Sequence, residues 1–260
     1  CPAARRAFHG GMCAGTSCRD QGEDLTNDLE ERPLAATIEV RDLSHTYSAG
    51  TPFQHDAVKH MSFSVEKGEF LGIIGHTGSG KSTLLNMLAG LESPTDGFLE
   101  IDGEPVGILS ERKRIQFRRN SIGFVFQSYN LMPQYTTLEN VALPLAIRGV
   151  SKRVRDELAE EALYRVGLQD NLRHRPSELS GGEQQRVGIA RAIIAKPPIV
   201  LADEPTGNLD TKTSDEVMQL LTELFREEKT TFVLVTHDPE MRRYMDRTIC
   251  LRDGRLSDTI

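Results

Sequence analysis

One short segment constrains the fold of this chain more than any other, because residues 75–82 read GHTGSGKS. An apolar run at 70–74 precedes the segment and is typical of a buried strand. Residues 83–90 follow it, with leucines at helical spacing and a closing glycine, and are typical of a helix. A strand, a glycine-rich loop and a helix in this order are the context of a phosphate-binding loop.

The residue types of the loop suit a polyphosphate. Glycines let backbone N–H groups turn toward phosphate oxygens, and the positive end of the following helix faces the same anions. Lys81 adds a full charge beside the β- and γ-phosphates, and Ser82 offers a hydroxyl to Mg²⁺. A chance glycine-rich turn is the alternative, and the flanking strand and helix disfavour it. We therefore predict that a nucleotide binds to Gly75, His76, Thr77, Gly78, Ser79, Gly80, Lys81, Ser82 and Thr83.

The composition excludes one class of partner. The chain has 260 residues and a formal net charge of −7, which argues against a nucleic-acid binder that works by neutralising phosphates. It contains 5 tyrosines and 0 tryptophans, so a base-stacking platform for single strands is also disfavoured. No apolar run reaches the ~18–20 residues of a membrane-spanning helix. Residues 1–33 are predicted to be an unstructured leader, and residues 34–260 a folded domain.

The strand signals are of two kinds. Alternating stretches predict a small antiparallel sheet and lie at 36–40, 58–65 and 98–101. Continuous apolar stretches predict buried strands of a mostly parallel sheet and lie at 70–74, 122–126, 199–202 and 231–236.

Two predicted helices separate the strand at 122–126 from the later ones. A capping box, Thr136-x-x-Glu139, would open the first, which runs to about Arg148. The second would span 151–167, with an apolar face formed by Val154, Leu158, Ala162 and Val166. The two predicted helices together indicate an α-helical lobe at about 128–176. The fold class is therefore α/β: a phosphate-loop NTPase core with a mostly parallel sheet, a small antiparallel β subdomain and an inserted α-helical lobe.

The segment LSGGE at 179–183 could bind a second anion. Ser180 and Glu183 form another capping box, which by itself indicates only the start of a helix. Gly181 and Gly182 would weaken that first turn. Close approach of an anion to bare N–H groups explains the two glycines better.

Polar residues also stand at the ends of two buried strands. Asp203 and Glu204 follow 199–202, at the carboxyl end of a strand, where open α/β sheets bind ligands. Asp203 suits Mg²⁺, and Glu204 suits a general base; a solvated acid pair is the alternative. His237 follows 231–236, although a lone histidine in such a place is more often structural.

Together these motifs closely resemble the nucleotide-binding domain of ATP-binding cassette (ABC) proteins, from about residue 37 to 253. The matching segments are GHTGSGKS as Walker A, FVFQ as the Q-loop, LSGGE as the family signature, IVLADEP as Walker B, NLD as the aspartate loop and VTHD as the H-loop. The signature discriminates, since unrelated ATPases share Walker A and Walker B. Glu183 departs mildly from the commoner glutamine, and Gly207-Asn208 from the frequent Ser-Ala.

The resemblance implies roles for residues outside the phosphate loop. Tyr47 would stack on adenine, with core packing as the alternative for a strand aromatic. Ser180 and Gly182 would bind the γ-phosphate of ATP held on the opposite protomer, and Asp210 would link the two sites. His237 would hold the γ-phosphate, and Gln127 would sense the membrane partner. The implied catalytic set is Glu204, His237 and Gln127, and the implied metal ligands are Ser82, Gln127 and Asp203.

The segments 129–133, 138–141 and 203–210 resemble the branch of the family that handles lipoprotein release and macrolide export. The resemblance implies an ATP-hydrolysing subunit with ATP and Mg²⁺ as ligands, paired with a second copy and with a separate integral membrane permease. It would lie in the cytoplasm, on the inner face of the membrane, and power export or mechanotransmission. The alternative is a regulatory ABC ATPase of the cell-division type, whose membrane partner transports nothing.

Overall fold

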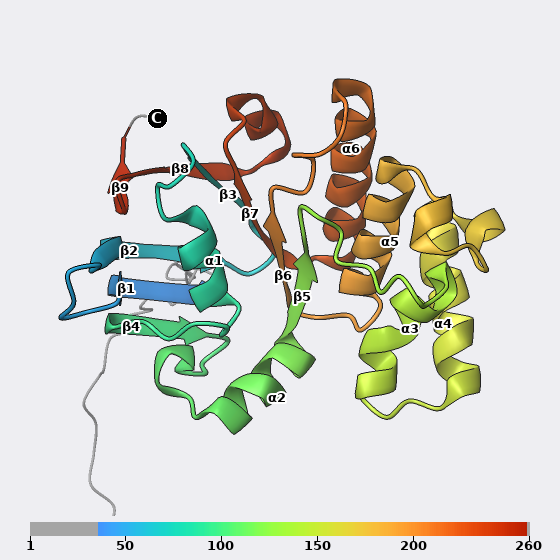
Figure 1. The fold of residues 1–260 in the computed structure, drawn as a ribbon, viewed down its shortest axis with the longest axis horizontal. Coiled ribbons are helices and arrows are strands. Elements are labelled where there is room, and N and C mark those ends of the chain that lie inside the picture. The colour runs from blue at the N-terminus through green and yellow to red at the C-terminus, as the bar shows by residue number, and fades with distance from the viewer. Residues whose placement is uncertain (1–35, 259–260) are drawn as a thin grey trace, which may run out of the picture. The chain divides into compact units, whose positions relative to one another are not determined.

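The computed structural model describes residues 36–258, so the predicted leader at 1–33 lies outside the described residues. The larger of its two sheets has six strands in the order β5-β6-β7-β3-β8-β9 (Figure 1). All neighbours pair in parallel except β8 and β9. The strands are β3 (Phe70–Gly75), β5 (Ile122–Val125), β6 (Ile199–Asp203), β7 (Thr231–Thr236), β8 (Arg247–Arg252) and β9 (Arg255–Ser257).

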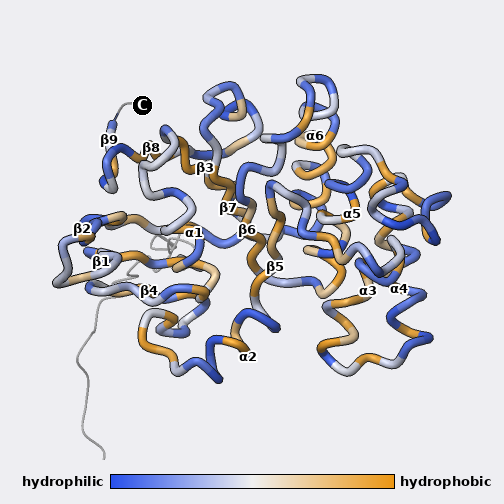
Figure 2. The backbone as a smooth tube through the Cα atoms, in the orientation of Figure 1, coloured by the Kyte–Doolittle hydropathy of each residue, from blue (hydrophilic) through white to orange (hydrophobic). Residues whose placement is uncertain are grey.

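The central strands of this sheet are buried on both faces. Every residue of β3 and β7 is buried, and Figure 2 shows β3, β6 and β7 as a continuous hydrophobic band. Apolar side chains on both faces are the pattern expected of parallel strands covered by helices on each side. Because parallel strands end at one edge, their carboxyl ends place Gly75, Asp203 and Thr236 along the same rim.

The smaller sheet is antiparallel, with the order β2-β1-β4. It confirms the predicted antiparallel piece, although its strands run beyond the predicted stretches: β1 (Ala36–Tyr47), β2 (His55–Glu66) and β4 (Asp96–Ile101). Helix α1 (Lys81–Leu88) lies between the two sheets, and its side chains share one apolar core with those of β1, β3 and β6 (Figure 1).

The segment predicted to form the lobe, about 128–176, contains α3 (Thr137–Ile147), α4 (Lys152–Arg165) and a 3-10 turn at Gln169–Asn171; a second turn, Pro176–Glu178, follows. The predicted capping box of α3 is confirmed, since Thr136 accepts from the Glu139 N–H and the Glu139 carboxylate accepts from the Thr136 N–H. The predicted apolar face of α4 is wrong in part. Val154 and Leu158 are exposed, and Ala159 and Leu163 are buried instead.

Other elements were not predicted: the helices α2 (Glu111–Ser121) and α6 (Thr211–Glu228), and the strands β8 and β9. Helix α5 (Gly181–Ile193) begins at the second predicted capping box, which the structure confirms. Short 3-10 turns at Val106–Ile108 and Pro239–Tyr244 complete the elements of residues 36–258. No helix in this range is long and apolar enough to cross a membrane.

Candidate nucleotide site

The loop between β3 and α1 leaves its backbone donors uncapped. Gly80 precedes α1 with φ +98 and supplies no side-chain cap, and a Cβ there would lie 2.3 Å from the Ala57 carbonyl oxygen. Only glycine fits this conformation and this contact. The buried hydroxyl of Ser79 also has no hydrogen-bond partner in the described part of the chain. The first turn of α1 therefore presents free donors of the kind that bind anions.

Lys81 is held across this loop. Its side chain is buried, and its ammonium donates to the carbonyl oxygens of Gly75 at 2.8 Å and His76 at 2.9 Å. Burial lowers the pKa of Lys81, while the charges of Glu204 and Asp203 act to raise it. The ammonium is therefore fixed beside the loop and feels the charges of the two consecutive acids at the end of β6.

Ser82 and Asp203 bring two oxygen ligands together. The Ser82 hydroxyl lies 3.5 Å from Asp203 Oδ1, and Asp203 is the last residue of β6. Burial raises the pKa of Asp203, and the neighbouring Glu204 charge raises it further. A partly desolvated carboxylate beside a hydroxyl is a donor set that suits Mg²⁺, which prefers oxygen ligands and would relieve this crowding of negative charge.

Glu204 and His237 form a pair at the same rim. Glu204 Oε2 lies 2.9 Å from Nδ1 of His237, and the two side chains are 17% and 54% exposed, respectively. The Glu204 N–H donates to the Val235 carbonyl at 3.0 Å, and its φ is +42, which is the left-handed region. The backbone therefore fixes Glu204 in a strained conformation that aims its carboxylate at a half-exposed histidine.

Gln127 and Tyr47 flank the centre from two sides. A Cβ on Gly207 would lie 2.7 Å from the Gln127 amide nitrogen, so this side chain lies against the turn that follows Glu204. Tyr47 ends β1, and its hydroxyl lies 3.3 Å from the Thr83 hydroxyl. Tyr47 is 37% exposed, so core packing is the wrong reading of this aromatic.

The signature residues do not join this group. Figure 1 shows α1 and the start of α5 well apart, with β6 and β7 between them. The Ser180 hydroxyl bonds within its own capping box, and the same box lowers the pKa of Glu183. A Cβ on Gly182 would lie 2.6 Å from the methyl group of Thr213. The N–H and the hydroxyl of Thr213 both donate to the Asp210 carboxylate. The residues Ser180, Gly181, Gly182 and Asp210 therefore form a second patch, which we call the signature patch.

Close packing within the chain is a second reason why glycine occupies positions 181 and 182. The Cβ contact of Gly182 falls on Thr213, and a Cβ on Gly181 would lie 2.9 Å from the Tyr129 hydroxyl. Sequence reasoning attributed both glycines to an anion alone. The hydrophobic period of α6, with Val217, Leu221 and Leu224 buried, could have located this neighbour of the signature patch.

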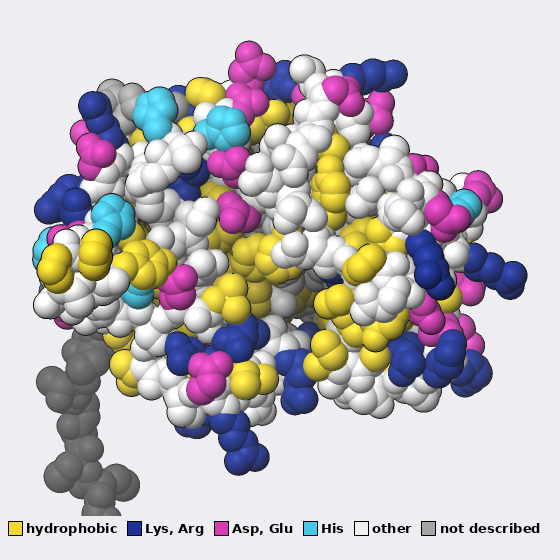
Figure 3. All heavy atoms as spheres, in the orientation of Figure 1, with side chains coloured by type: hydrophobic (Ala, Val, Ile, Leu, Met, Phe, Trp, Pro, Cys, Tyr) yellow, Lys and Arg dark blue, Asp and Glu magenta, His cyan; other side chains and the backbone are white. Residues whose placement is uncertain are grey.

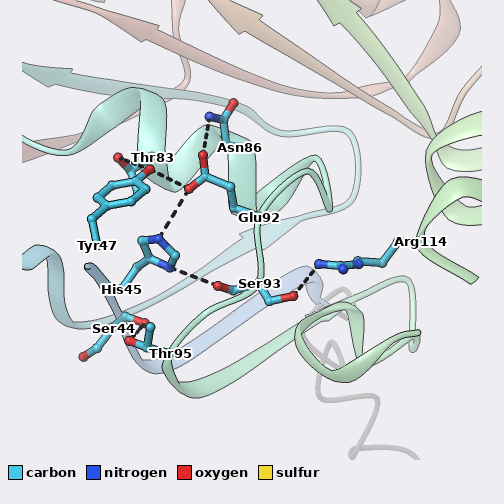
Figure 4. A network of polar contacts seen from close by, with 9 residues as sticks. All are labelled: Ser44, His45, Tyr47, Thr83, Asn86, Glu92, Ser93, Thr95 and Arg114. Carbon is cyan, nitrogen blue, oxygen red and sulfur yellow. Dashed lines mark hydrogen bonds and ion pairs between the residues drawn. The ribbon is translucent and has the colours of Figure 1, made fainter. Parts of the chain in front are cut away.

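Three side chains around Tyr47 were also missed: His45, Asn86 and Glu92 (Figure 4). The Tyr47 hydroxyl donates to Glu92 Oε2 at 2.6 Å. None of the three lies in a recognisable motif, and Glu92 is brought to Tyr47 only by the packing of the loop after α1 against β1.

The parallel sheet, the uncapped loop and the Lys81–Asp203–Glu204 cluster define the class of phosphate-loop ATPases. Residues 58–207 match the family model described as ABC transporter. The chain is 46% identical over 223 residues to the lipoprotein-releasing system ATP-binding protein LolD of Geobacter metallireducens, covering 86% of this chain and 99% of that one. The chain belongs to the ABC transporter family.

Solved structures agree with this assignment. A dimeric, post-hydrolysis state of the ATP-binding cassette MJ0796, bound to ADP and Pi, matches with a TM-score of 0.78 and 42% identity over 85% of this chain and 96% of that one. CbiO1 of Clostridium perfringens, part of the ABC transporter complex CbiONQ, matches with a TM-score of 0.77 and 30% identity over 85% of this chain and 87% of that one. The protein is an ATP-binding and ATP-hydrolysing cassette of an ABC transporter, and the resemblance to the lipoprotein-release branch is confirmed.

Proposed function

We propose that this cassette powers export, or transmits force, through a separate membrane permease, and that it acts as a pair of copies on the cytoplasmic face of the membrane. Its similarity to a lipoprotein-releasing ATPase over 99% of that protein supports export rather than the purely regulatory, cell-division type of complex. The convergence of Lys81, Asp203 and Glu204 at one rim of the sheet supports the ATP-driven part of the proposal. Residues 34–260 would form the working domain.

The chain's own residues divide the work of hydrolysis. The uncapped start of α1 and Lys81 would bind the phosphates and neutralise their charge, which is the main requirement of phosphoryl transfer. Ser82, Asp203 and Gln127 would hold Mg²⁺, which would add positive charge beside the β- and γ-phosphates. Glu204 would take the proton of the attacking water, and His237, bonded to Glu204, would hold the γ-phosphate and orient the carboxylate.

The signature patch would act on the nucleotide of the partner copy. The patch includes the start of α5, where two glycines occupy the first turn of the helix. This end of the helix lies away from the phosphate loop of its own chain (Figure 1). A second copy, turned to face the first, would bring that helix end to the γ-phosphate and complete the site.

A groove between α2, β5, α3 and α5 would receive the permease. It encloses about 360 Å³ and includes Phe124, Ile115 and Ile147 among its lining residues, the two isoleucines being 53% and 61% exposed. In Figure 3, hydrophobic side chains gather beside a cluster of lysines and arginines over this part of the molecule. Arg191 lines the groove too, and burial lowers its pKa. The Arg191 guanidinium already donates to the carbonyl oxygens of Asn130 and Tyr129. A short amphipathic segment with an acidic residue would cover the apolar floor and lie beside this arginine.

The test uses the cassette co-expressed with a candidate permease from the same organism. Ile115→Asp and Ile147→Asp place a charge on the apolar floor, so we expect either variant to abolish co-purification of the two proteins in detergent. The ATPase rate of the isolated cassette should stay within about twofold of wild type, because neither side chain approaches the nucleotide site. Tyr164→Asp, on the exposed face of α4, is the matched control. An intact complex in both groove variants would refute this docking surface.

The same complex separates the two functional alternatives. Reconstituted in vesicles with a lipid-anchored protein in the membrane, an exporting complex should release that protein in proportion to the ATP hydrolysed. ATP hydrolysis that responds to the permease but releases nothing would favour the regulatory alternative.

A further inference from the structure

The phenol group of Tyr47 is held by a residue that belongs to no motif. Its hydroxyl donates to Glu92 Oε2 at 2.6 Å and lies 3.3 Å from the Thr83 hydroxyl (Figure 4). Burial raises the pKa of Tyr47, and the bond to Glu92 raises it further, so the phenol remains a donor. A short bond between a phenol and a carboxylate is charge-assisted and about twice as strong as a neutral one.

Glu92 lies after the end of α1 and is itself anchored to that helix through Asn86. Its other oxygen, Oε1, accepts from the Asn86 side-chain amide at 3.1 Å, and its N–H donates to the Asn86 carbonyl at 3.3 Å. Both carboxylate oxygens therefore have a protein partner, and one of these partners belongs to the helix that begins at the phosphate loop. The position of the Tyr47 hydroxyl is therefore fixed relative to α1, the helix whose first turn would bind the phosphates.

His45 supports the other side of the pair. Its ring meets the Tyr47 ring edge to face, with centroids 4.5 Å apart and an interplanar angle of 79°. Its Nε2 lies 3.5 Å from Glu92 Oε2, and its Nδ1 lies 2.9 Å from the Ser93 carbonyl oxygen. Only an N–H can satisfy that carbonyl, so Nδ1 donates and the ring plane is set by the backbone.

The loop that carries Glu92 is fastened to α2 as well. The Arg118 guanidinium donates to the Gly90 carbonyl at 2.6 Å, and the Arg114 guanidinium bonds the Ser93 hydroxyl. Residues 90–93 are thus held between α1 and α2. A rigid support of this kind fixes a binding side chain before the ligand arrives, which lowers the entropy lost on binding.

We propose that Glu92 is a positioning residue for base recognition: it fixes the ring of Tyr47 in the orientation that stacks on adenine. The inference rests on the role of Tyr47 in the proposed function. A tyrosine with a free hydroxyl end would have to be ordered by the base itself, whereas the Glu92–Asn86–His45 network orders it beforehand. Glu92 would act on ATP only through Tyr47, so its loss should weaken ATP binding and leave the chemical step unchanged.

The experiment is a double-mutant cycle on the purified full chain. Glu92→Gln replaces the charge-assisted bond by a neutral one, Tyr47→Phe removes the bond, and both leave the stacking ring in place. We expect each to raise the Kd and the KM for ATP about fivefold, with kcat within about twofold. The double variant should bind ATP no more weakly than Tyr47→Phe alone, because both changes act on the same bond. Glu223→Gln, an exposed acid on α6, is the charge-matched control.

Inorganic tripolyphosphate separates positioning from a general structural role. It binds the phosphate loop without a base, so its Kd by calorimetry should be the same in wild type and in Glu92→Gln. An equal loss for ATP and tripolyphosphate would show that Glu92 acts on α1 rather than on Tyr47, and additive effects in the cycle would show that the two residues act independently. Either result overturns the proposal.

Two further variants show whether the inference or the proposed function is at fault. Tyr47→Ala should weaken ATP but not tripolyphosphate, and Lys81→Ala should weaken both. If Tyr47→Ala leaves ATP binding unchanged, the adenine role of Tyr47 fails, and the inference with it. If Tyr47→Ala weakens ATP binding while Glu92→Gln and Tyr47→Phe do not, only the positioning role fails.

Discussion

At Glu204 the backbone takes a left-handed conformation that few residues other than glycine adopt. Its N–H is bonded to β7, and its carboxylate to His237. Such a conformation costs of order 1–3 kcal/mol and persists only where surrounding bonds enforce it. The strained backbone turns the Glu204 carboxylate in a different direction from that of the adjacent Asp203, whose oxygen points to Ser82. Two neighbouring acids can therefore serve a metal and a water separately.

Glu204→Gln tests this division. The amide keeps the shape of the side chain but loses its basicity, so turnover should fall by roughly 10²–10⁴, as expected of a general base. The Kd for Mg-ATP should stay close to wild type, because the phosphate loop and Ser82–Asp203 are untouched. Steady-state hydrolysis and calorimetry measure the two quantities. Asp203→Asn is the comparison and should instead weaken the Mg²⁺ dependence of binding. Turnover within a few-fold of wild type in Glu204→Gln would move the role of the base to His237.

Sequence patterns identify the residues of a motif but not their supports. Lys81, Ser82 and Asp203 follow from the residue types and from the strands that precede them. Glu92 does not, because it is 45 positions from Tyr47 (92 − 47) and the bond between them exists only once the loop after α1 is folded. In the sequence, Asn86 is likewise only a polar position within a predicted helix.

At the scale of the element, local signals were strong where side chains bond to their own backbone or face the core. The capping boxes of α3 and α5 were predicted at the correct residue. Helix α2 was not, because Phe117 is its one buried residue and, apart from the exposed Ile115, the rest of its sequence is charged and polar. On α4 the expected stripe was displaced, since α3 and α5 cover Ala159 and Leu163 rather than Val154 and Leu158. Packing partners decided both cases.

The cap of α5 gives a stability that depends on pH. The Ser180 hydroxyl and N–H donate to Glu183 and hold its pKa below the ordinary value of a glutamate, about 4.5. A lowered pKa in the folded state means stabilisation that is present above about pH 4.5 and lost as the pH falls through the folded-state pKa. Glu183→Gln keeps the hydrogen bonds but removes the charge at the helix N-terminus. At pH 7 we expect about 0.3–1 kcal/mol less free energy of unfolding.

Urea unfolding of wild type and Glu183→Gln, at pH 7 and at about pH 3, measures the difference. The difference should shrink at the lower pH, because Glu183 is more protonated there in both the folded and the unfolded state. Glu160→Gln, on the exposed face of α4, removes an equal charge outside a cap and should change little at either pH. A difference for Glu183→Gln that is the same at both pH values would contradict the assigned cause.

At the scale of the whole molecule, the sequence indicated the class of sheet but not the order of its strands. Strand β3 lies between β7 and β8, which are the most distant from it in the chain among the parallel strands. No local pattern encodes such pairings, which depend on the packing of the finished core. The same long-range packing separates the phosphate loop from the signature patch. In the proposed arrangement, each copy would therefore carry two halves of a site that only a second copy could close.

This separation predicts a dimer that depends on ATP and on Ser180. In the Glu204→Gln background, where ATP persists, light scattering after size exclusion should show a dimer with Mg-ATP and a monomer without it. Ser180→Arg places a bulky cation where the start of α5 would meet the partner's phosphate, and should abolish the dimer. It also removes a helix cap, which costs about 1 kcal/mol of stability in itself.

Thr136→Arg separates these two effects, because it removes the equivalent capping box of α3, which lies outside the signature patch. We expect Thr136→Arg to lose similar stability in urea but to keep its ATP-dependent dimer. If Ser180→Arg also keeps the dimer, the signature patch does not meet the partner's nucleotide. If both variants lose it, stability rather than the patch controls assembly. Loss in Ser180→Arg alone would support a site that forms only between two copies, with one protomer supplying the phosphate loop and the other the start of α5.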